Sequence, residues 1–110
     1  MAEPTIKDVI AWFEDEQAME DVVYCQEYPE LVWQAIFEVL QRDLTADEKG
    51  ELAVGPLEEL LYFHGADFID RVELAAQQHP QFNHLLGGVW RAEMPLEIWE
   101  RVQKARKEVW

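Results

Sequence analysis

Two adjacent glycines, Gly87 and Gly88, lie between an apolar pair and a tryptophan in the stretch HLLGGVWRAEMP. Glycine-rich backbone can cradle a phosphate when Lys and Ser or Thr follow it, or when a strand leads into it. Here Val89, Trp90 and Arg91 follow, and no strand pattern precedes. We therefore expect a joint rather than a phosphate site. The glycines would end a helix at positive φ and let two backbones meet, with the Trp90 ring buried nearby.

Three histidines, His64, His79 and His84, are the residues most able to hold a metal. His79 and His84 are five positions apart, whereas two ligands on one helix face are three or four apart. A zinc site needs further ligands, and Cys25 is the only cysteine. The sequence therefore predicts no metal and no cofactor. His64, just before Gly65, is expected at a helix end, where its ring can bond carbonyl groups.

The remaining polar residues do not form a recognisable acid–base pair or an activated nucleophile. Glu58 and Glu59 are adjacent carboxylates, and paired carboxylates catalyse only when their environments separate their pKa values. Arg71 is expected to form a buried structural ion pair with Glu58. Cys25 lies among apolar neighbours with no positive charge beside it, which predicts an inert buried thiol. The chain contains no serine, so a serine triad has no nucleophile, and we predict no enzymatic activity.

The segment WFEDEQAMEDVVYCQEYPE, residues 12–30, mixes acidic with aromatic residues. Aromatic anchors inside a charged rim are typical of protein interfaces. The alternative is a solvated helix face with ordinary core aromatics. The candidate partner-binding residues are Glu14, Asp15, Glu16, Glu20, Asp21, Tyr24, Glu27 and Tyr28.

Negative charge is concentrated in the first half of the chain. The 110 residues carry a formal net charge of −14, of which residues 1–60 contribute −13 and residues 61–110 contribute −1. An acidic surface repels nucleic acid and anionic lipid and attracts basic proteins or cations. Solubility alone is the alternative explanation.

Three features of the sequence bear on where in the cell the protein is located. No apolar run approaches the roughly 20 residues of a membrane helix. The N-terminal residues do not have the basic start and apolar stretch of a signal peptide. A single cysteine favours a reducing compartment. Together these features predict a cytoplasmic protein that does not bind membranes.

Apolar residues recur at helical spacing, and no stretch alternates as a strand would. Thr5 is expected to cap a first helix, and Pro29 to open a helix at about 30–42 that is apolar almost all round and therefore central. Thr45 with Glu48 is a capping box for the next helix.

Glycine and proline mark the remaining breaks. Gly55–Pro56 is expected to stop one helix and start another, Gly65 to close that helix, and Pro95 to open the last one. The prediction is one all-α domain over residues 1–110. It would contain seven or eight short helices packed as antiparallel α-hairpins, loosely like HEAT repeats.

Three segments of the chain carry a recognisable set of residues. They are Pro29, Glu30, Trp33, Gly55, Pro56, Leu57, Glu58, Leu60, Leu61, His64, Gly65, Phe68, Ile69, Arg71, Val72, Leu86, Gly87, Gly88, Val89, Trp90 and Pro95. Together these segments resemble a family of small bacterial proteins with no assigned function. The resemblance covers roughly residues 16–106 and implies an all-helical fold, but it supplies no activity.

Charge, size and the absence of a chemical motif predict an acidic protein-binding module with no nucleic-acid or membrane partner. The most concrete form is an immunity- or antitoxin-type inhibitor that captures a basic bacterial toxin. The alternative is a helical adaptor with no inhibitory role. An inhibitor gene would lie beside a toxin gene, whereas an adaptor gene need not.

Overall fold

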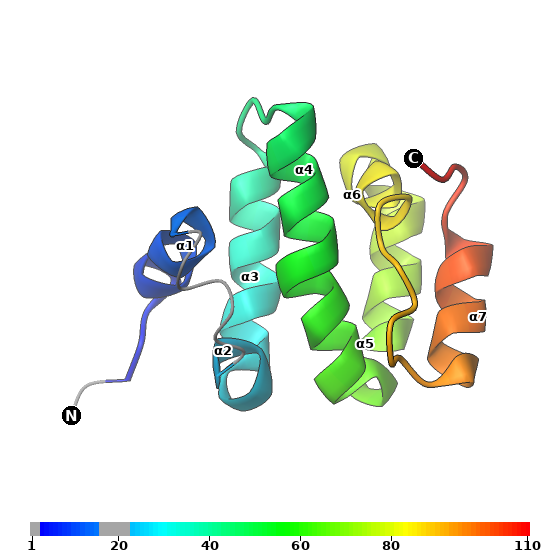
Figure 1. Ribbon diagram of the computed structural model, residues 1–110, viewed down its shortest axis with the longest axis horizontal. Coiled ribbons are helices and arrows are strands. Elements are labelled where there is room, and N and C mark those ends of the chain that lie inside the picture. Colours follow the sequence, from blue (N-terminus) through cyan, green and yellow to red (C-terminus); the bar gives the residue numbers. More distant parts are fainter. Residues whose placement is uncertain (1–2, 16–22) are drawn as a thin grey trace.

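The computed structural model describes residues 3–15 and 23–110, and every regular element in these ranges is helical (Figure 1). The elements are α1 (Ile6–Glu14), α2 (Val23–Glu27), α3 (Pro29–Leu40), α4 (Ala46–Leu52), the π-helical turn η2 (Ala53–Leu57), α5 (Glu58–Gln78), α6 (Pro80–Leu86) and α7 (Leu96–Ala105). Because α4, η2 and α5 follow one another without a break, the described residues form six continuous helical segments. The all-helical prediction is confirmed, and the described residues show six helical segments where seven or eight helices were predicted for the whole chain.

Local capping explains why three of these helices begin where they do. The Thr5 side chain accepts the Asp8 N–H, and the Asp8 carboxylate accepts the Thr5 N–H at 2.8 Å. Thr45 and Glu48 exchange the same pair of hydrogen bonds at 3.0 and 3.2 Å. Pro29 occupies the first turn of α3, where its missing N–H leaves no hydrogen bond unmade. These three starts agree with the predictions.

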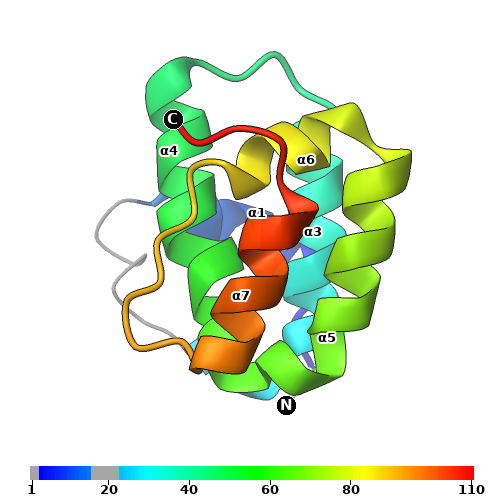
Figure 2. The ribbon, with the colours of Figure 1, turned by 90° about the vertical axis from the view of Figure 1, so that its right-hand side faces the viewer.

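The predicted break at Gly55–Pro56 is wrong. In an α-helix the ring of Pro56 would clash with the carbonyl of Leu52 and would remove one hydrogen bond. The wider π turn η2 accommodates the proline, so the chain stays helical. The break predicted at Gly65 is instead a kink, since His64 leaves the helical region (φ −133°, ψ 27°) within α5. After the kink α5 turns back along the molecule (Figures 1 and 2).

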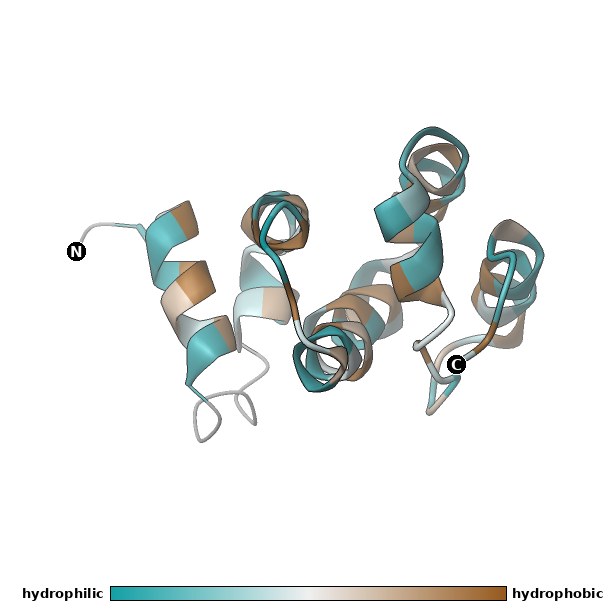
Figure 3. Ribbon diagram, turned by 90° about the horizontal axis from the view of Figure 1, so that it is seen from above, coloured by the Kyte–Doolittle hydropathy of each residue, from teal (hydrophilic) through white to brown (hydrophobic). Residues whose placement is uncertain are grey.

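Helix α3 is a central element, as predicted, because it contacts α1, α2, η2, α5 and α6. Its Trp33 ring lies 5.6 Å from Phe68 and 5.5 Å from Phe82, so three helices share one aromatic cluster. Helix α6 nevertheless buries a larger share of its residues, four of seven against five of twelve in α3. Figure 3 shows the hydrophobic side of α1 turned toward its neighbours and the hydrophilic side turned outward. Within the described ranges, none of the helices has the length and apolar character that spanning a membrane requires.

Candidate functional site

The predicted partner-binding residues that the structure describes lie around the junction of α1, α2 and α3. Glu14 ends α1, and Asp15 is the residue that caps it. Tyr24 and Glu27 belong to α2, and Tyr28 precedes α3. The three remaining candidates lie outside the described residues; they are Glu16, Glu20 and Asp21.

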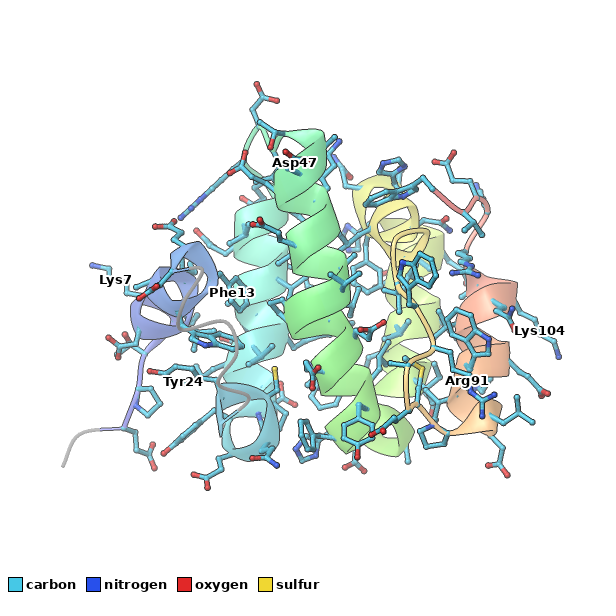
Figure 4. The ribbon with its side chains drawn as sticks, viewed as in Figure 1. Lys7, Phe13, Tyr24, Asp47, Arg91 and Lys104 are labelled. Atoms are coloured by element: carbon cyan, nitrogen blue, oxygen red, sulfur yellow. The ribbon has the colours of Figure 1, made fainter. Side chains whose placement is uncertain are left out.

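The aromatic residues of this region form one cluster with a buried end and a partly exposed end. Trp12 is only 6% exposed and belongs to the core. The Tyr24 ring lies 5.3 Å from Trp12 and 6.3 Å from Tyr28, and both tyrosines are half-buried. Figure 4 shows Tyr24 extending from α2 beneath α1. The tyrosines, not the tryptophan, are therefore the partly exposed members of this cluster.

Two acids of this region already have basic partners within the chain. Arg42 donates a hydrogen bond from Nη1 to Glu14 at 2.7 Å. Arg71 binds both carboxylate oxygens of Glu30, which holds the pKa of that carboxyl below its ordinary value. The predicted pairing of Arg71 with Glu58 is wrong, because α3 brings Glu30 to the second arm of α5, on which Arg71 lies.

An open groove of about 380 Å³ continues this acidic region between α1, α3, α4 and η2. Apolar side chains, among them Phe13 and Leu52, form part of its wall. Four carboxylates line the same groove, those of Glu14, Asp43, Glu48 and Glu51. Such a combination suits a long cationic side chain, whose methylene stem covers apolar surface while its head meets carboxylates. Sequence reasoning named Glu14 and missed the other three, because they reach α1 only through tertiary contact.

Glu58 and Glu59 lie on another face, next to the loop that follows α6. Glu58 accepts the Trp90 N–H at 2.9 Å. Burial raises the pKa of both carboxyls, with the charge of Glu59 adding to the effect at Glu58 and that of Glu93 adding to it at Glu59. The pKa values of the two carboxyls therefore move in the same direction.

The glycine pair is a joint, although not of the predicted kind. Gly87 has an ordinary helical φ of −63°, and none of the described glycines has a positive φ. The glycines are needed for close approach: a Cβ on Gly88 would lie 2.6 Å from the Trp110 ring, and one on Gly87 would collide with the Glu108 carbonyl. The Trp110 indole donates to the His84 carbonyl at 2.6 Å, and its main-chain N–H donates to the Gly87 carbonyl at 3.0 Å.

Trp90 was predicted to bury its ring beside the glycines, and this prediction is wrong. Its side chain is 69% exposed, and Trp110 occupies the place beside the glycines. The two tryptophans could not be told apart by local sequence, because the contact with Trp110 joins residues more than twenty positions apart.

The three histidines contact different parts of the chain. His64 donates from Nε2 to the Gln26 carbonyl at 2.7 Å, which agrees with the predicted contact to a carbonyl but places that carbonyl on α2. His84 pairs with Glu108 at 2.7 Å, and the His79 ring lies against Phe37. Among residues 3–15 and 23–110, no three His, Cys, Asp or Glu side chains form a group that could hold a metal ion.

Cys25 is fully buried in the core, as the sequence predicted. Its Sγ contacts the Pro56 carbonyl at 3.7 Å. Burial, with the negative charge of Glu59, raises the pKa of the thiol to about 12. A thiol in this state is a poor nucleophile at neutral pH, because the thiolate is the reactive form.

The sequence model of a family described as a family of unknown function, DUF6869, matches residues 2–109. The chain belongs to this family. No curated protein and no solved structure matches the chain. Membership of DUF6869 carries no reaction or partner with it, so a function for this member has to be argued from its own residues.

Proposed function

We propose that this protein is a cytoplasmic, acidic protein-binding module, most concretely an immunity- or antitoxin-type inhibitor that captures a basic toxin. The observation that carries the proposal is the acidic groove between α1, α3 and α4, which joins four carboxylates to an apolar wall. The groove lies in the half of the chain that holds −13 of the net charge.

A lysine or arginine of the partner would place its stem against Phe13 and its charged head among the carboxylates. The chain itself offers a small-scale precedent, because the guanidinium of Arg42 already binds Glu14 at the edge of this groove. The exposed ring edges of Tyr24 and Tyr28 would supply contact area beside the groove. Aromatic side chains of this kind carry a large share of the binding energy in protein interfaces.

The strong negative net charge of this protein would attract a basic partner before the two proteins touch. Opposite charges steer two proteins together and raise the association rate by about ten-fold or more at low salt. An inhibitor needs rapid capture, so the charge distribution suits inhibition. Antiparallel helix pairs stacked loosely like HEAT repeats would hold the acidic groove rigid.

The second candidate is a helical adaptor that binds a basic protein without inhibiting it. Both candidates require binding, and they differ in what binding does to the partner. Once a partner has been isolated by capture on the immobilised chain, its activity is measured with and without an excess of this protein. Loss of activity supports the inhibitor, and unchanged activity supports the adaptor.

The binding surface is tested by surface-plasmon kinetics with that isolated partner. Association should slow between about 0.05 and 0.5 M salt, where the Debye length falls from roughly 14 to 4 Å. Reversal of two groove charges, Asp43→Lys with Glu51→Lys, should lower the on-rate by about ten-fold. Neither residue has a hydrogen-bonded cap or ion pair among the described contacts, so the fold should persist.

The matched control reverses two acids on α7, Glu97→Lys with Glu100→Lys, which changes the net charge equally on a different helix. The control should lower the on-rate by only about two-fold. Equal effects of the two double variants would mean that the groove is not the binding surface. Association that ignores both salt and the groove variant would refute the proposal.

A further inference from the structure

A second and larger cavity of about 680 Å³ lies at the upper end of the molecule in Figure 1, where the end of α3, the α3–α4 loop, α4 and α6 meet. Its volume lies within the range of about 300–1,000 Å³ typical of small-molecule sites. Four apolar residues contribute to its lining, Leu40, Leu44, Pro80 and Leu85. The cavity therefore has room and apolar surface for a small organic molecule.

Basic residues outnumber acidic ones in the lining of this cavity, whereas acids predominate in the chain as a whole. Arg42, Lys49 and His84 all line it, and Asp43 is the only acid among its lining residues. The complete chain has nine Lys and Arg against 23 Asp and Glu. Two of those nine cations thus meet at one apolar cavity, next to a histidine from a third element.

We propose that this cavity binds a small organic anion with an apolar body, such as a medium-chain carboxylate. The carboxylate would lie between Arg42 and Lys49, and the hydrocarbon would cover Leu44 and Leu85. The hydrogen bond from Arg42 to Glu14 uses one of the five N–H groups of the guanidinium. A planar guanidinium can therefore serve both groups, or can exchange the carboxylate of Glu14 for that of the ligand.

The net charge of −14 opposes an anion at long range, but salt limits that opposition. At physiological ionic strength the Debye length is about 8 Å, so acids beyond that distance act weakly on the bound carboxylate. The nearby cations and the apolar wall decide the binding. An uncharged analogue of the same length would keep the apolar contacts and lose the cation contacts.

The test titrates octanoate into the full chain at physiological salt, followed by isothermal calorimetry and by amide chemical shifts. Octanoate should bind saturably and shift the amides around Lys49 and Gln81. Lys49→Gln and Arg42→Gln should each weaken binding by roughly three- to five-fold, the range of a partly exposed ion pair. Glu14→Gln should strengthen binding by about two-fold, because it releases Arg42.

Lys104→Gln is the matched control. It removes one positive charge from α7, on the side of the molecule away from α1 (Figure 4), and should change octanoate affinity by less than about 1.5-fold. Octanol, which has no charge, should bind at least about three-fold more weakly than octanoate. Thermal melts of each variant confirm that the fold is retained.

Three results would overturn the proposal. The first is no saturable octanoate binding, the second is equal weakening by Lys49→Gln and Lys104→Gln, and the third is equal affinity for octanol and octanoate. None of them bears on capture of a basic protein, because that proposal is tested with a different ligand, the isolated partner protein.

Discussion

Gly88→Ala should destabilise the protein because of Trp110 alone. A Cβ built on Gly88 lies 2.6 Å from Cη2 and 2.8 Å from Cζ2 of the Trp110 ring. The next atom, the Ala53 Cβ, is 3.1 Å away, which a shift of a few tenths of an ångström relieves. Since none of the described glycines has a positive φ, alanine fits the backbone at this position.

The expected cost is limited by what the protein loses if Trp110 leaves its place. That residue makes two hydrogen bonds, to the Gly87 and His84 carbonyls, worth about 1 kcal/mol each. Its ring stacks on His84 at a centroid distance of 5.2 Å, which adds about 0.5–1 kcal/mol. Alanine also lowers the entropy of the unfolded chain, which returns about 0.5 kcal/mol. If all these contacts are lost, the net loss should be about 2–2.5 kcal/mol.

A double-mutant cycle isolates the contact. Urea unfolding is followed by far-UV circular dichroism for the parent, Gly88→Ala, Trp110→Ala and the double variant. In the Trp110→Ala background, Gly88→Ala should be neutral or stabilise by up to about 0.5 kcal/mol. The coupling energy should therefore be about 2–3 kcal/mol.

Gly50→Ala is the matched control. A Cβ at Gly50, within α4, meets nothing within 4 Å, so the substitution should stabilise the protein by about 0.5–1 kcal/mol. If Gly88→Ala costs the same with and without Trp110, the steric argument is wrong and another contact explains the glycine. No cost in the parent background would refute it as well.

The remaining predictions concern ionisable groups. Cys25 should react with a thiol reagent at pH 8 only as fast as the protein opens, which reagent kinetics in the folded and urea-unfolded chain measure. The buried neutral thiol should contribute to the free energy of unfolding below pH 9.0, and this contribution should be lost as pH rises toward the raised pKa of about 12. Unfolding experiments at high pH measure that loss. Glu30→Gln should lower the free energy of unfolding by about 0.5 kcal/mol, because Glu30 and Arg71 are both partly exposed. In the parent this contribution is present above pH 4.5 and is lost as pH falls through the lowered pKa of Glu30. An unchanged urea midpoint for the variant at pH 7 would count against the prediction. Glu58→Gln keeps an oxygen that accepts the Trp90 N–H and removes a half-buried charge. The free energy of unfolding at pH 7 should therefore stay within about 0.5 kcal/mol of the parent or rise. Glu58→Ala removes the acceptor and should lower the free energy of unfolding.

The candidate surface was only partly predictable. Glu14, Tyr24 and Tyr28 were named from a run of acids and aromatics close together in sequence, and the structure places the described members of that run at one junction. The groove acids Asp43 and Glu51 could not be named with them. Local sequence does not indicate that these acids line the same groove as Glu14, because the groove forms only where α1, α3, α4 and η2 come together in the fold.

Sequence alone determined the features that depend on residues within one helical turn. The capping boxes at Thr5 and Thr45 and the proline at the start of α3 are examples, since a side chain there bonds a main-chain group three residues away or removes an N–H that no bond needs. The all-helical class follows from the same short-range periodicity.

Tertiary structure decided which distant groups meet. Gly55–Pro56 has the local chemistry of a helix end, yet the segment is buried through Ala53, Pro56 and Leu57 and continues as a π turn. Arg71 had two acids within reach in principle, and the position of α3 beside α5 selected Glu30. Trp110 covers the glycines because two hydrogen bonds hold it there. Each of these contacts forms because it lets the whole chain bury its apolar side chains and complete its hydrogen bonds at the same time. No short segment of sequence contains that information.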